Sequence, residues 1–279
     1  MIKFSGSLGL GETMTHAELD FVKASPVAMR TLLDKSGCVL LRGMIPVDRV
    51  ERYRDALDAV YQRYDESPAD FVEFPEAKSV AQGDVSPKIF AKFSGVAIEA
   101  LFDHPKLEEF MSSVLGPYLP TLHTFMSVGS QEKAIPGLNL HTDGIIQGTD
   151  NFVGCLWAPL HPCGIESPGL SVVPAPRQAV LKYLQRKFPE KKIPGWSSTT
   201  EWNDTKAFEI SAITAEFGDI WKPCMNPGDV MAFTNWTIHG SNVAPAMTRR
   251  RSAAILRLMS RPTLLHRIVA KFRKLLTAG

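Results

Sequence analysis

The sequence predicts an all-β core with helices: a double-stranded β-helix, or cupin-like jelly roll, with N-terminal helices packed on its sheet. Residues 16–36 and 46–64 have the apolar spacing of helices, and from residue 118 onward short segments rich in β-branched and aromatic residues follow one another. Gly, Pro and Asn separate these segments at intervals typical of an antiparallel barrel. The chain of 279 residues is long enough for one large domain, which we expect to span residues 1–262.

The first third, residues 1–115, is predicted to be rich in helices. Residues 16–36 are expected to form a helix, and CVLLRG at 38–43 is a short apolar run closed by glycine, which is typical of a strand. The helix expected over residues 46–64 begins near a proline and aligns four residues on one face: Val50, Tyr53, Leu57 and Val60. We expect that face to pack on the sheet.

The jelly-roll core is predicted over residues 118–260. Its expected strands are TLHTFMSVG, GLNLHTDGI, NFVGCLWAPL, GLSVVPA, DVMAFTNWTIHG and RSAAILRLMS. An insertion at residues 176–206 holds a predicted helix, PRQAVLKYLQRKFPE, and a polar segment that contains Trp196 and Trp202. Insertions of this length often cover an active site, and a passive surface loop is the alternative.

Residues 263–279 are predicted to form a basic amphipathic helix. In LLHRIVAKFRKLLTAG the apolar residues fall on one helical stripe, the basic residues fill the other faces, and there is no acid. Two roles are open. Residues 264–276 could bind peripherally to an anionic membrane, or the stripe could pack against the jelly roll or a second subunit.

Composition excludes several other classes. A net charge of +2 provides no basic field for nucleic acid, so we expect no nucleic-acid partner. The four cysteines are widely spaced without a CxxC pair, which argues against a zinc site and a disulfide framework and favours a reduced compartment. No leader and no run of about 20 apolar residues is recognised, so the expected location is cytoplasmic, with peripheral binding at the inner membrane face. The oligomeric state is left open.

The segment LNLHTDGI points to a metal. In a strand, His141 and Asp143 would project to the same face. The composition alone predicts about 0.7 such pairs, and His16 with Glu18 forms another, which we expect on a helix surface. His239, at the end of a strand launched by an NPGD turn, would complete two histidines and one carboxylate, the facial triad of non-haem Fe(II) oxygenases. Hydrogen-bonded structural histidines are the alternative.

A cation follows this triad. Arg250 and Ser252 would alternate onto one face of the next strand, where a guanidinium can bind a carboxylate through two bonds and a hydroxyl can add a third. An iron site beside a carboxylate pocket implies a chelating keto acid. The register leaves Arg251 open as the binder, and a surface role remains open for Arg249 and Arg251.

Four blocks resemble the phytanoyl-CoA dioxygenase family of Fe(II)/2-oxoglutarate oxygenases: SGCVLLRGMIPVDRVERYRDAL, LHTDG, GLSVVPA and NPGDVMAFTNWTIHGSNVAPAMTRRRS. The resemblance implies iron bound by His141, Asp143 and His239, 2-oxoglutarate bound by Arg250 with Ser252, and O2 as co-substrate. The implied reaction is hydroxylation of an unactivated C–H bond. A carboxylate at Asp143 argues against halogenation, because related halogenases carry a small residue there. The chain departs from the family where PGSH is replaced by PAPR, which leaves one substrate contact open.

The substrate is less constrained. Strands beside the ligands supply four candidate substrate contacts, for which core packing is the alternative: Thr124, Met126, Trp157 and Trp236. The basic tail favours a lipid-linked or glycolipid substrate such as a lipopolysaccharide sugar, and a small-molecule natural product or catabolic substrate is the alternative. A cupin isomerase or a non-catalytic jelly-roll binding protein would share the fold, and 2-oxoglutarate dependence distinguishes them.

Overall fold

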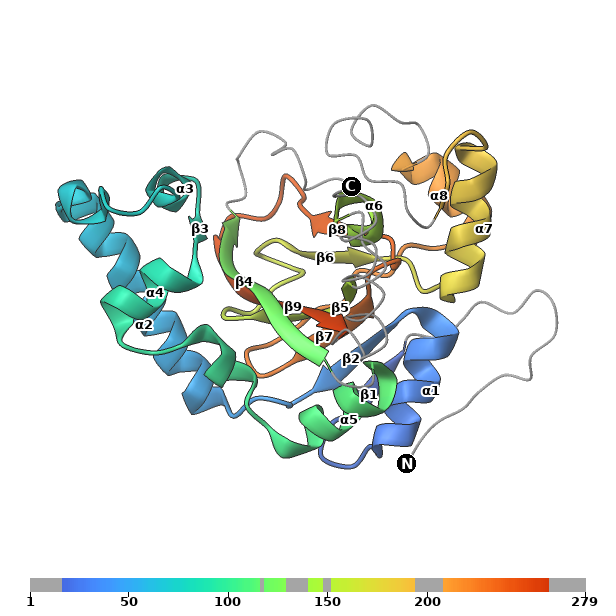
Figure 1. Cartoon of the computed structure of the whole chain (residues 1–279), viewed down its shortest axis with the longest axis horizontal. Coiled ribbons are helices and arrows are strands. Elements are labelled where there is room, and N and C mark those ends of the chain that lie inside the picture. Colours follow the sequence, from blue (N-terminus) through green and yellow to red (C-terminus); the bar gives the residue numbers. More distant parts are fainter. Residues whose placement is uncertain (1–16, 116–117, 129–139, 148–151, 194–207, 261–279) are drawn as a thin grey trace, which may run out of the picture.

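Two β-sheets form the centre of the molecule, and helices cover them (Figure 1). The computed structural model describes residues 17–115, 118–128, 140–147, 152–193 and 208–260. The large sheet has seven strands in the order β1-β2-β7-β5-β9-β4-β3, and the small sheet pairs β6 with β8. The large-sheet strands are β1 Glu18–Asp20, β2 Cys38–Arg42, β3 Asp84–Val85, β4 Tyr118–Val128, β5 Phe152–Pro159, β7 Val230–Thr234 and β9 Arg251–Ser260; the small-sheet strands are β6 Gly169–Val172 and β8 His239–Asn242.

The helices are described in two groups by their order along the chain (Figure 1). The N-terminal group is α1 Pro26–Ser36, α2 Val47–Glu66, α3 Ala77–Ala81, α4 Pro87–Ser94 and α5 Pro105–Leu115, with short 3-10 helices at Pro68–Phe71 and Ile98–Phe102. The second group is α6 Asp143–Gln147, α7 Arg177–Lys187 and α8 Ile210–Phe217. Helix α2 confirms the prediction for residues 46–64, since its four predicted apolar residues are all buried. In the described part of the chain, no helix combines the length and apolar character needed to cross a bilayer.

The prediction of one helix over residues 16–36 is wrong at its start. Residues Glu18–Asp20 form β1, which runs parallel to β2. The Glu18 carboxylate also forms an ion pair with the Arg42 guanidinium at 3.0 Å. The helix begins only at Pro26, because the Ser25 hydroxyl accepts a hydrogen bond from the amide of Ala28 and proline fits the first helical turn. It ends at Gly37, whose φ of +70° and whose approach to Ala175 both require glycine.

Strand β9 is buried on both faces. Ala253 and Ile255 belong to the cluster between the two sheets, together with Trp157, Val172 and Met231. Ala254, Leu256 and Leu258 belong instead to the larger cluster between the sheet and the N-terminal helices. The large sheet therefore has an interior face, directed at the small sheet, and a helix-covered face, as expected for a jelly roll.

Two predicted segments differ from the structure. GLNLHTDGI is not one strand, because His141 makes an isolated bridge and Asp143 begins α6. DVMAFTNWTIHG is two strands in different sheets, because the chain turns at Asn235 and Trp236 between β7 and β8. The helix predicted at 176–190 is confirmed as α7. The segment with Trp196 and Trp202 and the predicted C-terminal helix at 263–279 lie outside the described residues.

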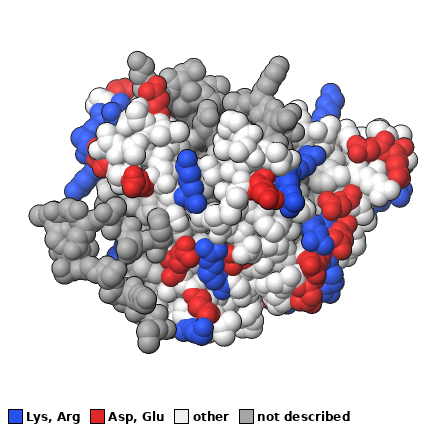
Figure 2. All heavy atoms as spheres, turned by 180° about the vertical axis from the view of Figure 1, so that it is seen from behind, with Lys and Arg blue, Asp and Glu red and all other residues white. Residues whose placement is uncertain are grey.

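The surface carries charges of both signs. Figure 2 shows Lys and Arg interspersed with Asp and Glu over the described part of one face, without a large area of a single sign. Several of these charges form exposed ion pairs, such as Arg186 with Glu216 and Arg63 with Asp70. This face agrees with the small net charge of +2.

Candidate active site

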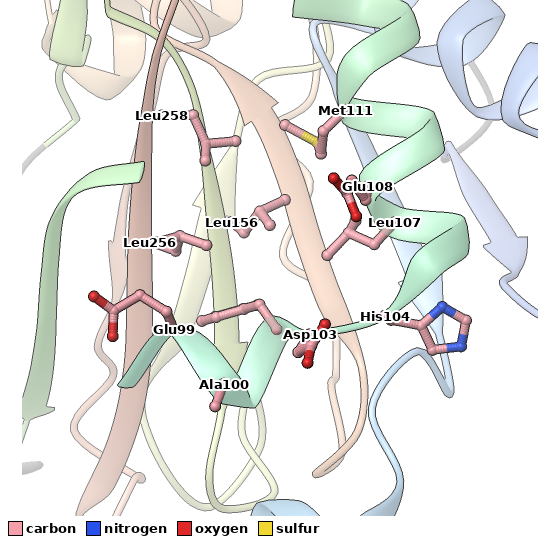
Figure 3. Close-up of a pocket in the computed structure, with 11 residues that line it drawn as sticks. Glu99, Ala100, Asp103, His104, Leu107, Glu108, Met111, Leu156, Leu256 and Leu258 are labelled. Atoms are coloured by element: carbon pink, nitrogen blue, oxygen red, sulfur yellow. The ribbon is translucent and has the colours of Figure 1, made fainter. Parts of the chain in front are cut away.

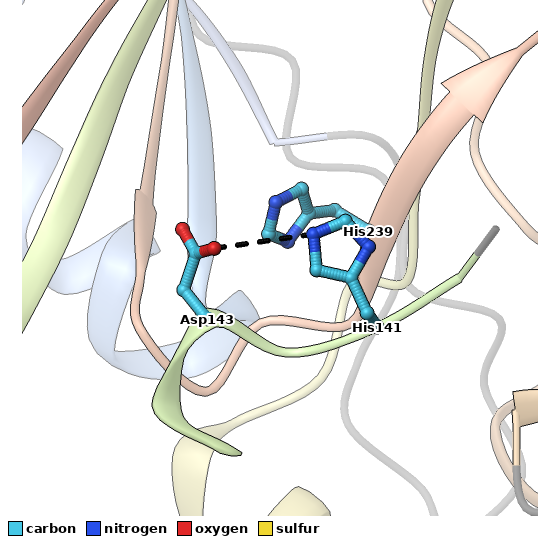
Figure 4. A group of neighbouring side chains, drawn as sticks. All are labelled: His141, Asp143 and His239. Atoms are coloured by element: carbon cyan, nitrogen blue, oxygen red, sulfur yellow. Dashed lines mark ion pairs between the residues drawn. The ribbon is translucent and has the colours of Figure 1, made fainter. Parts of the chain in front are cut away.

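The three predicted metal ligands come together at one end of the interior (Figure 4). One ligand atom from each of His141, Asp143 and His239 lies within 4.8 Å of the others, and all three residues are buried. His141 Nε2 is 3.9 Å from Asp143 Oδ1, and the two imidazole ring centres are 4.4 Å apart. Two imidazoles and one carboxylate on one side of a small space are the donor set that fits Fe(II) and leaves coordination positions open.

The backbone explains how these side chains meet. His141 and His239 exchange both amide-to-carbonyl hydrogen bonds at 2.9 Å, so they are direct neighbours across an antiparallel bridge. Residues paired in this way present their side chains to the same side. Asp143 reaches that side through the turn into α6, where the amide of Gly144 donates to the carbonyl of Asn235 at 2.7 Å. The spacing of two was informative, although the strand alternation used to interpret it was wrong.

Gly144 and Trp236 support the turn that carries Asp143. A Cβ atom at Gly144 would lie 2.8 Å from Trp236 Cδ2, so only glycine allows the buried indole to pack against this backbone. Trp236 belongs to the cluster around α7 and α8, together with Ile145 and Ile238. The structure therefore places Trp236 behind the Asp143 turn, while its predicted contact with substrate remains untested.

The electrostatics favour the protonation states that a metal needs. Burial, with the nearby His141, lowers the pKa of His239 to about 4, so this imidazole is neutral at neutral pH. Its Nδ1 lies 2.9 Å from the Thr237 carbonyl, an acceptor that assigns the proton to Nδ1 and leaves the Nε2 lone pair for a metal. Burial alone would raise the pKa of Asp143, but the positive charge of Arg257 and the two histidines outweigh it and hold the pKa below its usual range.

A buried arginine lies in the same interior. Arg251 is 1% exposed, its Nε donates to the Pro168 carbonyl at 3.0 Å, and its guanidinium lies 4.8 Å over the Trp157 ring. Burial lowers its pKa to about 10, so it remains a cation at neutral pH. Its Nη1 and Nη2 have no hydrogen-bond partner among the described residues. Two free donors on a buried cation are what the carboxylate of a keto acid would satisfy.

Arg250 and Ser252 do not lie with the triad. Arg250 is exposed, with its guanidinium 5.5 Å over the ring of Tyr61 in α2, and both residues line a cavity of about 350 Å³ on the helix-covered side. The amide of Ser252 donates to His161 Nδ1 at 3.3 Å. The predicted register is wrong by one residue, because β9 starts at Arg251 and its odd-numbered residues face the interior.

The other candidate substrate contacts are placed as follows. Trp157 is buried in the interior cluster beneath Arg251. By backbone register, Thr124 is opposite Ile255 and Met126 is opposite Ala253, which are both interior residues. Sequence reasoning missed Arg257, whose Nε lies 3.5 Å from Asp143 Oδ2. Its place two strand repeats beyond Ala253 on the same face was the available signal.

Comparison with known proteins agrees with this site. The model of the family described as Phytanoyl-CoA dioxygenase (PhyH) matches residues 33–250. A search of curated protein sequences finds no match. Among solved structures, EctD from S. alaskensis in its apoform has a TM-score of 0.56 and 15% identity, with 88% of this chain and 81% of that chain covered.

Two further solved structures show the same fold. AviO1 from Streptomyces viridochromogenes Tue57 has a TM-score of 0.54 and 13% identity, with 86% of this chain and 96% of that chain covered. The epimerase SnoN, solved with Fe3+, alpha ketoglutarate and nogalamycin RO, has a TM-score of 0.55 and 12% identity, with 85% and 84% covered.

The fold and the site define an enzyme of the oxygenase class. The chain belongs to the phytanoyl-CoA dioxygenase family, since the family model covers most of its length. It is therefore an Fe(II)/2-oxoglutarate-dependent oxygenase with iron, 2-oxoglutarate and O2 as cofactor and co-substrates, and the His-Asp-His group is its candidate iron site.

Proposed function

We propose that this oxygenase hydroxylates an unactivated C–H bond of an organic substrate, with iron bound by His141, Asp143 and His239 and the distal carboxylate of 2-oxoglutarate bound by Arg251. The observation that carries the second assignment is the buried guanidinium of Arg251, whose two terminal nitrogens have no hydrogen-bond partner among the described residues. It lies on the interior face of β9, which is also the face from which Arg257 reaches Asp143. Arg250, which the sequence favoured, is exposed on the other side.

The protein's share of the chemistry is binding and orientation. Iron with 2-oxoglutarate and O2 supplies the oxidising power, as cofactors do in such enzymes. His239 is a neutral donor, His141 supplies a second imidazole, and Asp143 supplies one negative charge that offsets part of the charge of the metal. The buried interior excludes water, which strengthens the attraction between Arg251 and a carboxylate.

Paired arginine variants test the 2-oxoglutarate assignment. Arg251→Met should raise the 2-oxoglutarate concentration for half-maximal turnover by at least about 30-fold, because removing one partner of a buried charge pair costs about 2 to 5 kcal/mol. The adjacent Arg250→Met is the matched control. Its 2-oxoglutarate concentration for half-maximal turnover should stay within about twofold of that of wild type. Succinate formation measures turnover, and thermal melting checks that both variants fold. The reverse ranking of the two variants would contradict the assignment.

We further propose that the substrate is lipid-linked and is met at an anionic membrane surface. The support is the basic, apolar-striped sequence of residues 264–276, which lies outside the described residues. The test is co-sedimentation with anionic vesicles, comparing the full chain with a chain ending at Pro262. Binding of the full chain alone, lost at high salt, is expected. Equal, negligible sedimentation of both chains would favour the alternative, a small-molecule natural product or catabolic substrate.

The remaining alternative is a protein that retains the fold without catalysis. Production of succinate that depends on added iron and 2-oxoglutarate would exclude it, and it requires no knowledge of the substrate, because oxygenases of this kind also turn over 2-oxoglutarate slowly without one. Screening lipid, sugar and amine compounds for acceleration of this background would then identify the substrate class.

A further inference from the structure

We infer that Arg257 is a positioning residue for the iron carboxylate: it holds the Oδ2 atom of Asp143 so that Oδ1 alone faces the metal. The two oxygens have different neighbours, since Oδ1 is 3.9 Å from His141 Nε2 while Oδ2 is 3.5 Å from Arg257 Nε. Oδ2 is buried and has no hydrogen-bond partner among the described residues, so this ion pair is the contact that the structure gives it. The inference rests on the proposed iron site.

The sheet brings Arg257 to this position. In the register of the large sheet, Arg257 is opposite Cys155 of β5 and Leu122 of β4. It shares the interior face with Arg251, six residues earlier, which places their backbones roughly 20 Å apart along the strand. The two arginines therefore enter the interior at different points along β9, with Arg257 beside Asp143 and Arg251 proposed for the distal carboxylate of the keto acid.

Burial gives the pair its strength. The side chains of Arg257 and Asp143 are 17% and 2% exposed, so water screens their attraction far less than that of a surface pair. A second carboxylate, Asp84 of β3, also acts on Arg257, and its buried Oδ1 has no hydrogen-bond partner among the described residues. Arg257 thus feels the charge of acids from β3 and from the start of α6, and the ion pair with Asp143 Oδ2 is the direct one.

This contact has a consequence for metal binding. A carboxylate can bind a metal through one oxygen or through both, and the second mode would occupy a coordination position that 2-oxoglutarate or O2 requires. A cation on Oδ2 favours the first mode, because binding of Oδ2 to the metal would break the ion pair. Arg257 would therefore keep a position open as well as orient the ligand.

The experiment measures metal binding directly, without turnover. Co(II) is titrated calorimetrically into metal-free wild type, Arg257→Met, Arg257→Lys and a control, Arg42→Met. Arg42 is a matched control because its Nη1 pairs with the buried Asp229 at 2.8 Å on β2, away from the triad. We expect Arg257→Met to bind Co(II) about 10- to 100-fold more weakly, the typical effect of losing a residue that orients a ligand, and Arg257→Lys to fall between. Arg42→Met should melt at a lower temperature with unchanged Co(II) affinity.

A double variant separates positioning from general stability. In an Asp143→Ala background, Arg257→Met should weaken Co(II) binding no further, because the residue acts through Asp143. The visible spectrum of the Co(II) protein, which reports coordination geometry, should change in Arg257→Met and not in Arg42→Met. If Arg257→Met does not fold, Arg257→Lys decides by the same titration.

The outcomes distinguish this inference from the proposed function. Wild-type Co(II) affinity in the folded Arg257 variants, or a further loss in the double variant, would overturn the positioning role while leaving the iron site intact. Absence of Co(II) and Fe(II) binding by the wild-type protein would instead overturn the proposed iron site.

Discussion

The two faces of the large sheet differ in whether their buried polar atoms have hydrogen-bond partners. The interior face holds charged groups with atoms that lack hydrogen-bond partners among the described residues, namely Asp143 Oδ2, Arg257 Nε and two nitrogens of Arg251. Where α5 covers the opposite face, that face is apolar, with Leu156, Leu256 and Leu258 packed toward α5 (Figure 3). A cavity of about 300 Å³ lies between these leucines and α5, and its charged residues, such as Glu108, come from the helical segment rather than from the sheet.

This difference indicates which face is built for stability and which for binding. A buried polar group without a partner costs roughly 1 to 3 kcal/mol, so the interior face has more to gain from a bound ligand than the helix-covered face. The helix-covered face contributes apolar burial without that cost. Substitutions on the interior face should therefore change binding and turnover most, and those on the helix-covered face should change stability most.

The largest expected effect on turnover comes from the triad. His239→Ala should abolish iron-dependent succinate formation, because it removes one of three ligands, while the fold is retained. The matched control is His161→Ala, since His161 lies on the helix-covered side, where its Nδ1 accepts from the amide of Ser252. Metal analysis and succinate assays measure both variants. Bound iron and normal turnover in His239→Ala would show that this histidine is not a ligand. The assignment of binding to the interior face would then be wrong.

A smaller effect on turnover is expected from a change in the turn that carries Asp143. Gly144→Ala places a Cβ atom 2.8 Å from Trp236 Cδ2, so either the indole or the Asp143 turn must shift. We expect turnover to fall about tenfold, since small displacements of a catalytic group are costly, and the melting temperature to fall because overpacking costs about 1 to 3 kcal/mol. The double variant with Trp236→Phe, which has a smaller ring, should recover part of both losses. Full activity in Gly144→Ala alone would show that the turn tolerates the shift.

The sequence predicted which candidate ligands come together better than it predicted their local structure. His141, Asp143 and His239 were identified from residue type and spacing, and the structure brings them within 4.8 Å. The strand proposed for the first two is absent because the chain turns at Asp143 to begin α6, where Gly144 meets Trp236. That contact joins residues about 90 positions apart in the sequence, so a local sequence pattern cannot predict it.

The interior position of Arg251 rather than Arg250 was missed for a different reason. Alternation of apolar and polar residues reveals the register of a strand only when one face meets water. Strand β9 is covered on both faces, so Ala253 to Leu256 are all buried and give no alternation. The serine at position 252 then favoured Arg250 as the carboxylate-binding residue, although Ser252 itself lines a cavity under α2 and α3. Arg257 lies on the same face as Ala253 and Ile255, so it could have been placed in the interior only once the register of β9 was known.

The smallest effect on turnover is expected one residue away from Arg257, on the opposite face of β9. Leu258 is fully buried against the helix-covered side and lines the cavity beside Met111 (Figure 3). Leu258→Ala should lower the free energy of unfolding by about 2 to 5 kcal/mol, because it removes apolar contacts and enlarges a cavity that the helices cannot easily close. Denaturant unfolding measures this loss. The 2-oxoglutarate requirement and the Co(II) affinity of the folded variant should remain those of wild type, since no atom of Leu258 faces the interior cluster. If Leu258→Ala raised the 2-oxoglutarate requirement as strongly as Arg251→Met, the two faces would be energetically coupled, and the assignment of binding to one face and stability to the other would be wrong.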